Sequence, residues 1–329
     1  MRFQFYSEAL DNVPKLSVDG TVSNSIHFSH WEGNTTPPEV KADTSTEIAL
    51  NLVASPNRAA LTNNIDLVTN NHFDTDGVLS VWTVLNGERA LEFRDLLVSS
   101  AEAGDFSEHS SNDGVRVSIA IQGSDQASSN NDDASPLASF LAGHEVDDEA
   151  QAYELVLPEV ERLLTNVNAY ESLWREGWDS VAAALESFAR GDSKVVEDPD
   201  SRISLITLAP GLSNARAAIA KHARGEMFLI ATQANGGWLY RLDYPYYSWA
   251  ETVVRPHIPR RDLTNALALL NEKEGARAHS RDGRWKTDNR EMTSAVKFLD
   301  AGGTLAVSRL EPNEVAAALS EHKVQSAKH

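Results

Sequence analysis

The sequence predicts an α/β protein with an N-terminal α/β lobe, a helical middle segment and a smaller C-terminal α/β lobe. Strand-like apolar runs alternate with helix-periodic stretches in residues 1–145, helical periodicity is nearly continuous over 146–200, and strands return among helices in 201–329. Strands that alternate with helices are typical of α/β folds, so we expect one lobe at each end of the helical segment.

The first part of the N-terminal lobe contains a clear helix signal. Residues 1–25 are expected to be extended or to form a hairpin, and a glycine and two prolines make 25–40 an irregular loop. Thr44 and Glu47 stand in capping-box spacing before an apolar run, which predicts a helix over 45–55.

A strand, a polar loop and a helix are predicted next. The apolar centre of 63–71 indicates a buried strand, and residues 72–77 form a loop whose glycine opens a helix that continues to residue 86. A further strand is expected within 91–100. The run 116–123 is periodic but fits a strand or a helix.

The remaining elements follow from turn residues and periodicity. Residues 124–135 contain almost no large apolar side chain and are expected to be a surface loop or linker. Helical periodicity fills 147–190. Strands are predicted at 203–208, 226–233, 237–244 and 304–310, and helices at 261–274, 291–300 and 312–322.

Composition excludes several classes of function. The 329 residues include 48 acidic and 29 basic side chains, a net charge of −19, which argues against an extended nucleic-acid surface. There is no cysteine, so thiolate metal sites, disulfides and a cysteine nucleophile are excluded. The apolar runs are short and the first residues do not have the pattern of a signal peptide, so we expect a cytoplasmic protein without membrane contact.

The strongest local signal is the segment HFDTDGVLS, residues 72–80. His72, Asp74 and Asp76 alternate in a loop that leaves the predicted strand at 63–71, so their side chains can point at one spot. Carboxylate and imidazole together suit a hard divalent cation such as Mn²⁺ or Mg²⁺. The helix that begins at Gly77 adds positive partial charge, which favours a bound phosphate.

This segment resembles the first motif of the DHH phosphoesterase superfamily, H-x-D-x-D-G-x-x-S. The resemblance implies a parallel sheet in the N-terminal lobe and a manganese centre with His72, Asp74 and Asp76 as ligands. Asp74 and Asp76 would be the catalytic residues. Gly77 and Ser80 would shape the helix start where substrate binds, and Asp105, in the string AGDF, is the nearest equivalent of a further metal aspartate.

The rest of the superfamily pattern is incomplete. No Asp-His-His triplet occurs, and Gly143-His144-Glu145 is only a faint echo of a Gly-His-Pro element. Further ligands are therefore sought among His27, His30 and His109, with His144 as a weaker candidate. The strings SHWEGNTTP, HFDTDGVLSVW and AGDF also resemble an uncharacterised bacterial family of unknown function.

A second match involves the same loop. Asp74-Thr75-Asp76-Gly77-Val78-Leu79 fits the D-x-D-G-V-L nucleophile loop of haloacid-dehalogenase-type phosphatases, in which Asp74 would be phosphorylated and Asp76 would be the general acid. That family places an apolar strand directly before the nucleophile. Here Asn70, Asn71 and His72 intervene, which favours the metal centre.

Aromatic and basic side chains are concentrated in 238–263. Arg241, Arg260, Arg261 and Tyr247 could hold a base and a phosphate by stacking and ion pairing. The alternative is a hairpin whose aromatic residues alternate into the core while the arginines lie at the surface.

The sequence therefore predicts a divalent-metal-dependent phosphoesterase, using Mn²⁺ or Mg²⁺, for a nucleotide, a short oligonucleotide or another small phosphoester. We expect its active cleft between the two lobes. The missing triplet also leaves open a non-catalytic nucleotide- or metal-binding protein. The oligomeric state is open, and a homodimer is one option.

Overall fold

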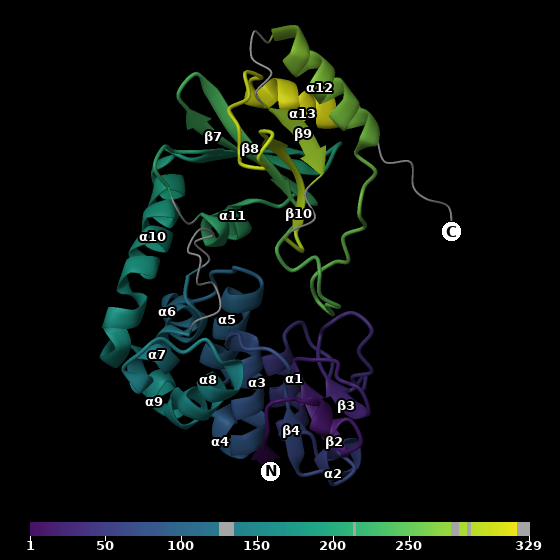
Figure 1. The fold of residues 1–329 in the computed structure, drawn as a ribbon, viewed down its shortest axis with the longest axis vertical. Helices are drawn as coiled ribbons and strands as arrows, with labels where there is room; N and C mark the ends of the chain where they lie inside the picture. The colour runs from purple at the N-terminus through teal and green to yellow at the C-terminus, as the bar shows by residue number, and fades with distance from the viewer. Residues whose placement is uncertain (125–134, 213–214, 278–282, 288–290, 321–329) are drawn as a thin grey trace. The chain divides into compact units, whose positions relative to one another are not determined.

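The computed structural model describes residues 1–124, 135–212, 215–277, 283–287 and 291–320. The chain divides into two compact units (Figure 1). The N-terminal unit comprises Met1–Val181 and Trp249–Pro256, and the C-terminal unit comprises Ala182–Ser248 and His257–His329. A short stretch from late in the sequence thus belongs to the N-terminal unit.

The N-terminal unit is built on a small parallel sheet with the strand order β1-β4-β2-β3. Its strands are β1 Arg2–Phe3, β2 Lys15–Val18, β3 Ser25–Phe28 and β4 Leu67–Thr69. All neighbouring strands are parallel, so the residues that follow β2, β3 and β4 meet at one edge. The α/β class and the parallel sheet are confirmed, whereas a hairpin within 1–25 is wrong.

Helices make up most of this unit. They are η1 Glu8–Leu10, α1 Ser45–Ala54, α2 Arg58–Leu61, α3 Thr75–Asn86, α4 Glu88–Leu91, α5 Arg94–Asp105, α6 Asn112–Gln122, α7 Pro136–Ala142, α8 Glu149–Val156, η2 Leu157–Glu159, α9 Val160–Thr165, η3 Val167–Tyr170 and α10 Glu171–Arg190, which continues into the C-terminal unit. The Thr44 cap is confirmed, since its side chain accepts the N–H of Glu47. Asp74 caps α3 in the same way through the N–H of Gly77.

Two segments of this unit had strand-like features but form helices. The strand expected within 91–100 is wrong, because Leu97 and Ala101, four residues apart, both point into the core from α5. The ambiguous run 116–123 lies mostly in α6. Most of the predicted loop 124–135 lies outside the described residues. Within the described parts of the chain, no helix is long and apolar enough to span a membrane.

The C-terminal unit contains a mixed six-stranded sheet with the order β5-β6-β7-β8-β10-β9. Its elements are β5 Lys194–Asp198, β6 Ile203–Leu208, α11 Arg216–His222, β7 Met227–Ala234, β8 Gly237–Asp243, α12 Thr264–Arg277, β9 Arg284–Thr287, β10 Ser294–Leu299 and α13 Pro312–Ser320. Only the pair β6 and β7 is parallel. The strands predicted at 203–208, 226–233 and 237–244 are confirmed.

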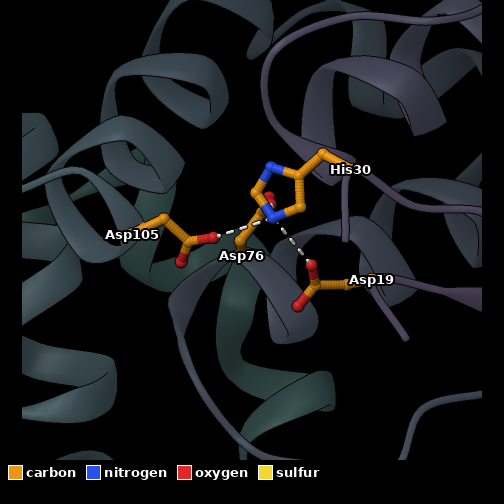
Figure 2. Close-up of side chains that lie close together, drawn as sticks. All are labelled: Asp19, His30, Asp76 and Asp105. Carbon is orange, nitrogen blue, oxygen red and sulfur yellow. Dashed lines mark ion pairs between the residues drawn. The ribbon is translucent and has the colours of Figure 1, made fainter. Parts of the chain in front are cut away.

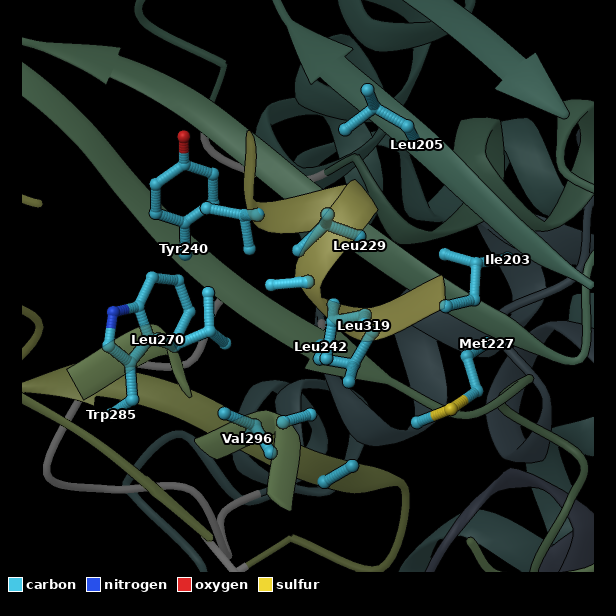
Figure 3. Packing of buried hydrophobic residues seen from close by; sticks show 14 of the residues in the cluster. Ile203, Leu205, Met227, Leu229, Tyr240, Leu242, Leu270, Trp285, Val296 and Leu319 are labelled. Carbon is cyan, nitrogen blue, oxygen red and sulfur yellow. The ribbon is translucent and has the colours of Figure 1, made fainter. Parts of the chain in front are cut away.

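The core of this unit follows the period of two along each strand. On one face, Leu229, Leu242 and Val296 from three neighbouring strands pack with Leu270 of α12 and Leu319 of α13 (Figure 3). Ile206, Phe228 and Ile230 belong to a separate cluster with α11 residues. Both faces of the sheet are therefore covered.

Two predictions fail at the end of this unit. The helix expected at 291–300 is wrong, because Ser294–Leu299 forms a strand between β8 and β9 whose residues are all buried. A strand buried on both faces lacks the alternation that would identify it. The strand expected at 304–310 is reduced to isolated bridges at Leu305 and Ser308.

Candidate metal centre

Acidic and histidine side chains gather at the edge of the parallel sheet where β2, β3 and β4 end. Asp19 directly follows β2, His30 comes two residues after β3, and His72 three residues after β4. Asp76 lies in the first turn of α3, and Asp105 is the last residue of α5. Four segments that are separate in sequence therefore supply one cluster, and His72 and Asp76 come from the same segment.

The first group of potential ligands surrounds the His30 ring. Its Nε2 atom lies 3.1 Å from Asp105 Oδ2, 3.4 Å from Asp19 Oδ1 and 3.7 Å from Asp76 Oδ2 (Figure 2). One ligand atom from each of these four residues lies within 4.8 Å of the others. Such a set of one nitrogen and three carboxylate oxygens could hold a divalent cation.

The second group is adjacent and shares one member with the first. His72 Nε2 lies 3.0 Å from Asp19 Oδ2 and 3.2 Å from Asp74 Oδ2. Asp19 therefore presents one oxygen to each histidine. A carboxylate placed in this way could bridge two cations, one in each group.

Asp19 is held in an uncommon backbone conformation. Its φ of +58° lies in the left-handed region, although it is not a glycine. Its N–H still donates to the carbonyl of Phe28 on β3. Backbone strain of this kind is concentrated at functional sites.

Asp76 and Asp74 are positioned by helix N-termini. The two oxygens of Asp76 accept the N–H groups of Ser45 and Thr46, each at 2.7 Å, at the start of α1. Asp74 Oδ1 accepts the N–H of Gly77 at 2.7 Å, which leaves Oδ2 directed at His72. Both carboxylates are thus fixed before any ligand binds.

The chemistry of the donor atoms fits a cation. Both oxygens of Asp19, Nε2 of His30 and of His72, and Oδ2 of Asp105 are buried without a hydrogen bond of good geometry among the described residues. The Nδ1 atom of His30 lies 2.7 Å from the carbonyl oxygen of Asp43 and donates to it. This leaves a lone pair on Nε2 in the neutral ring, the arrangement usual for a metal-ligating histidine.

Crowding of the acidic groups perturbs the pKa of most members. Burial together with the charge of Asp19 raises the pKa of Asp76 to about 7. Burial and the charges of Asp74 and Asp76 hold the pKa of Asp105 well above its usual value. A divalent cation would relieve this repulsion in place of protons.

At the two histidines, burial and the neighbouring carboxylates shift the pKa in opposite directions. Burial alone would lower the pKa of His30, but its contacts with Asp105 and Asp19 raise it well above 6.5. For His72, burial is outweighed by the charge of Asp74 and the contact with Asp19, which raise its pKa to about 12. The surrounding carboxylates thus favour the protonated form of both imidazoles.

Two glycines allow the segments to approach closely. A Cβ atom at Gly77 would lie 2.5 Å from Asn70 Nδ2 and 2.7 Å from the hydroxyl of Tyr153. A Cβ atom at Gly104, next to Asp105, would lie 2.8 Å from Cβ of Thr75. Any larger side chain at these positions would displace α5, or the loop of residues 72–77 (the motif loop), from the cluster.

Tyr153 of α8 supports the motif loop through two hydrogen bonds. This fully buried residue donates a hydrogen bond to the carbonyl of His72 at 3.1 Å and accepts one from Nδ2 of Asn70 at 3.0 Å. Its ring packs against Phe3 and Phe73. The helical segment after residue 146 thus contributes to the geometry of the site, which sequence reasoning missed.

The structure brings most of the predicted ligands together. His72, Asp74, Asp76 and Asp105 converge, and His30 joins them. The other histidines do not: Nδ1 of His27 accepts the N–H of Thr35, and half-buried His109 contacts Asn112. Exposed His144 lies against the carbonyl of Ala142.

Asp19 was not predicted and is the member common to both groups. Its signal was present, because Asp-Gly directly follows the apolar-containing strand KLSV, as a polar loop follows β4. Asp105 converges for a different reason from the one expected. It ends a helix, α5, rather than following a strand.

The residues predicted to bind substrate are placed as follows. Ser80 is buried and donates to the carbonyl of Gly77. In the C-terminal unit, Arg241 pairs with Asp243 and Glu291, and Arg261 pairs with Glu226. Arg260 lies over the Tyr244 ring, and Tyr247 packs against the sheet core. A substrate role for these residues stays a prediction.

The fold and the site thus define an α/β protein with a buried aspartate–histidine cluster that could hold a metal ion. The chain belongs to a family described as "Family of unknown function (DUF6687)", which it matches over residues 1–323. This confirms the expected uncharacterised family. No curated protein matches the sequence.

One solved structure to which the chain is similar is the pGpG-specific phosphodiesterase PggH from Vibrio cholerae. The identity is 12%, the TM-score is 0.34, and the match covers 93% of this chain and 82% of that one. A likeness this low defines neither the fold nor the activity of the present protein. Membership of the DHH superfamily stays a prediction.

Proposed function

We propose that this protein is a divalent-metal-dependent phosphoesterase that acts on a nucleotide, a short oligonucleotide or another small phosphoester. The observation that carries the proposal is the pair of ligand groups joined by Asp19. Two-metal sites with oxygen-rich ligands are a recurrent solution for phosphoester cleavage. The HFDTDGVLS motif, which resembles the first DHH motif, supports the same chemistry.

The charge balance supports two cations. Asp19, Asp74, Asp76 and Asp105 together carry four negative charges when ionised. Two divalent cations would neutralise them, and the mixture of carboxylate oxygen and imidazole nitrogen suits Mn²⁺ or Mg²⁺. The first group would hold one cation through His30, Asp76 and Asp105, and the second would hold another through His72 and Asp74.

Bound cations and the side chains of the centre would have separate roles in catalysis. Bound cations would supply Lewis acidity, activating water and neutralising charge on the leaving oxygen. Asp74 and Asp76, the residues that we place in the catalytic machinery, are held by the N-termini of α3 and α1 and need no rearrangement. Asp19 would keep the two groups at a fixed separation.

The haloacid-dehalogenase alternative is less well supported by the local geometry. In that mechanism a nucleophilic aspartate directly follows a strand, but β4 ends at Thr69, five residues before Asp74. Asp74 also uses one oxygen to cap α3, and its other oxygen faces His72. We therefore assign Asp74 to ligand binding rather than to covalent catalysis.

The proposal is tested by turnover of bis-p-nitrophenyl phosphate by metal-stripped protein to which Mn²⁺ or Mg²⁺ is returned. We expect activity that depends on the cation and is lost in D74N, D76N and D19N. The matched control is D113N, because Asp113 is an exposed aspartate paired with Arg116 on α6. Wild-type protein that binds neither cation would refute the proposal.

Two further measurements on the same protein separate the alternatives. Tight binding of nucleotide and cation without turnover would indicate the non-catalytic binding protein. A phosphate trapped covalently on Asp74 would indicate the haloacid-dehalogenase mechanism.

A further inference from the structure

Residues 249–256, here called the strap, come from late in the sequence but belong to the N-terminal unit. The chain on either side of the strap, up to Ser248 and from His257, belongs to the C-terminal unit. The strap is not a regular helix or strand. Its position must therefore depend on side-chain and backbone contacts with the unit that it joins.

Asp43 provides the main attachment. Its buried carboxylate accepts the N–H groups of three consecutive strap residues, Val253, Val254 and Arg255. The guanidinium of Arg255 adds a fourth hydrogen bond, with 2.7 Å between Nη1 and Asp43 Oδ2. Three successive amides and a guanidinium around one buried carboxylate make a specific docking site.

Arg255 extends this attachment to α5. It forms a two-pronged contact with Glu108, at 2.9 Å from Nε and 2.6 Å from Nη2, and reaches Glu102 at 2.7 Å. Glu102 precedes Asp105 by one helical turn. The arginine also lies over the ring of Phe106, 4.9 Å from its centroid. The strap thus contacts the end of α5, the helix that carries the potential ligand Asp105.

The same strap contacts His30 directly. Its Glu251 N–H donates to the carbonyl of His30 at 2.7 Å, and the Trp249 ring meets the imidazole edge-on, with 5.0 Å between centroids. The carbonyl of Asp43 accepts the Nδ1–H of His30. Asp43 therefore contacts the strap through its carboxylate and His30 through its backbone.

We propose that the strap positions the first ligand group, and that Asp43 and Arg255 are positioning residues for His30 and Asp105. Docking of the strap fixes the His30 ring with Nε2 directed at Asp19, Asp76 and Asp105. Release of the strap would leave the ring and the end of α5 free to move, so a cation would bind less tightly. This inference rests on the proposed metal centre but not on phosphoester hydrolysis.

The experiment measures Mn²⁺ affinity, by electron paramagnetic resonance of the free ion, in full-length wild type, D43A, R255A and R255K. Loss of partners that orient metal ligands costs about 10–100-fold in affinity, and we expect this loss in D43A and R255A. The Mn²⁺ affinity of R255K should lie between those of wild type and R255A, because lysine keeps the charge but cannot form the two-pronged contact. The matched control is R89A, which removes an exposed arginine that also pairs with two carboxylates, Glu92 and Glu161.

Two further measurements separate positioning from general damage to the fold. Hydrogen exchange of the peptide that contains residues 249–256 should be faster in D43A while the strands β2 to β4 stay protected. The visible spectrum of bound Co²⁺ should change in D43A and R255A, because it reports ligand geometry, and stay unchanged in R89A.

The outcomes are distinct. Wild-type Mn²⁺ affinity and Co²⁺ spectrum retained in both D43A and R255A would overturn the inference while leaving the metal centre intact. Unchanged hydrogen exchange of the strap in D43A would overturn it as well. Wild-type protein that binds no cation would overturn both this inference and the proposed function.

Discussion

The Tyr153→Phe substitution tests whether the helical segment behind the motif loop shapes the metal centre. The hydroxyl of Tyr153 donates to the His72 carbonyl and accepts from Asn70. Burial and the charges of Asp74 and Asp19 hold its pKa well above 10, so the phenol stays neutral and can donate. Phenylalanine keeps the ring contacts with Phe3 and Phe73 and removes both hydrogen bonds.

The expected loss follows from the two groups left behind. An unpaired buried polar group costs about 1–3 kcal/mol, and the cost at the His72 carbonyl lies near the lower end because that group is only part-buried. Losing both bonds should therefore reduce the free energy of unfolding of the N-terminal unit by about 2–4 kcal/mol. For a unit of this size, that loss corresponds to a fall of roughly 5–10 °C in the midpoint of thermal unfolding. His72 should also be held less firmly, so Mn²⁺ affinity should fall along with stability.

Thermal and urea unfolding of the metal-free protein measure the first effect, and a Mn²⁺ titration measures the second. The matched control is Tyr240→Phe, which removes a buried hydroxyl that donates to the carbonyl of Leu310 at 2.7 Å in the C-terminal unit. Tyr240→Phe should cost stability but leave Mn²⁺ affinity unchanged. If Tyr153→Phe unfolds like wild type, or lowers Mn²⁺ affinity no more than Tyr240→Phe does, the reasoning fails.

Three further predictions follow from the charges. In D19N, Mn²⁺ at 100 times the wild-type Kd should give far less than the stabilisation of about 2.7 kcal/mol expected for wild type, because the carboxylate shared by both groups is lost; equal midpoint shifts would contradict this. Mn²⁺ affinity should rise from pH 6 to pH 8, by up to about tenfold per pH unit for each proton displaced. The reason is that a cation must displace protons from His72 and Asp76, whose pKa values are raised to about 12 and about 7. An affinity that stays the same in titrations at three pH values would contradict this. In the C-terminal unit, burial alone would raise the pKa of Glu291, but contacts with Lys297 and Arg241 lower it to about 2. The stability it contributes is therefore present above about pH 4.5 and lost as pH falls toward 2, and E291Q should flatten that part of the acid-unfolding curve.

The fold could be predicted where local signals and tertiary packing agree. Thr44 capped its helix as expected, and β6, β7 and β8 lie where their apolar runs and the turn residues between β7 and β8 placed them. The sequence misled where burial overrode periodicity. Ser294–Leu299 is buried on every residue, including Lys297, whose charge is paired with Glu291, so no alternation marks it as a strand.

The candidate site was predictable to the extent that its residues lie in one motif. His72, Asp74 and Asp76 are close in sequence, so their alternation alone indicated a common target. Asp19, Asp43 and Tyr153 are brought to the same place only by strand order and by helix packing. Without the order β1-β4-β2-β3, nothing in the sequence shows that β2 and β4 end side by side.

Several features of the centre oppose folding, and they share one explanation. Asp19 adopts a left-handed backbone conformation, four carboxylates lie within two adjoining ligand groups, and buried polar atoms of both histidines lack hydrogen bonds of good geometry. Each of these costs stability, whereas an apolar cluster of similar volume would not. Two divalent cations would neutralise the four charges and give the unpaired atoms partners. A cation centre would account at once for the strain, the charge and the unsatisfied groups, whereas protons on the histidines and carboxylates would offset only the charge.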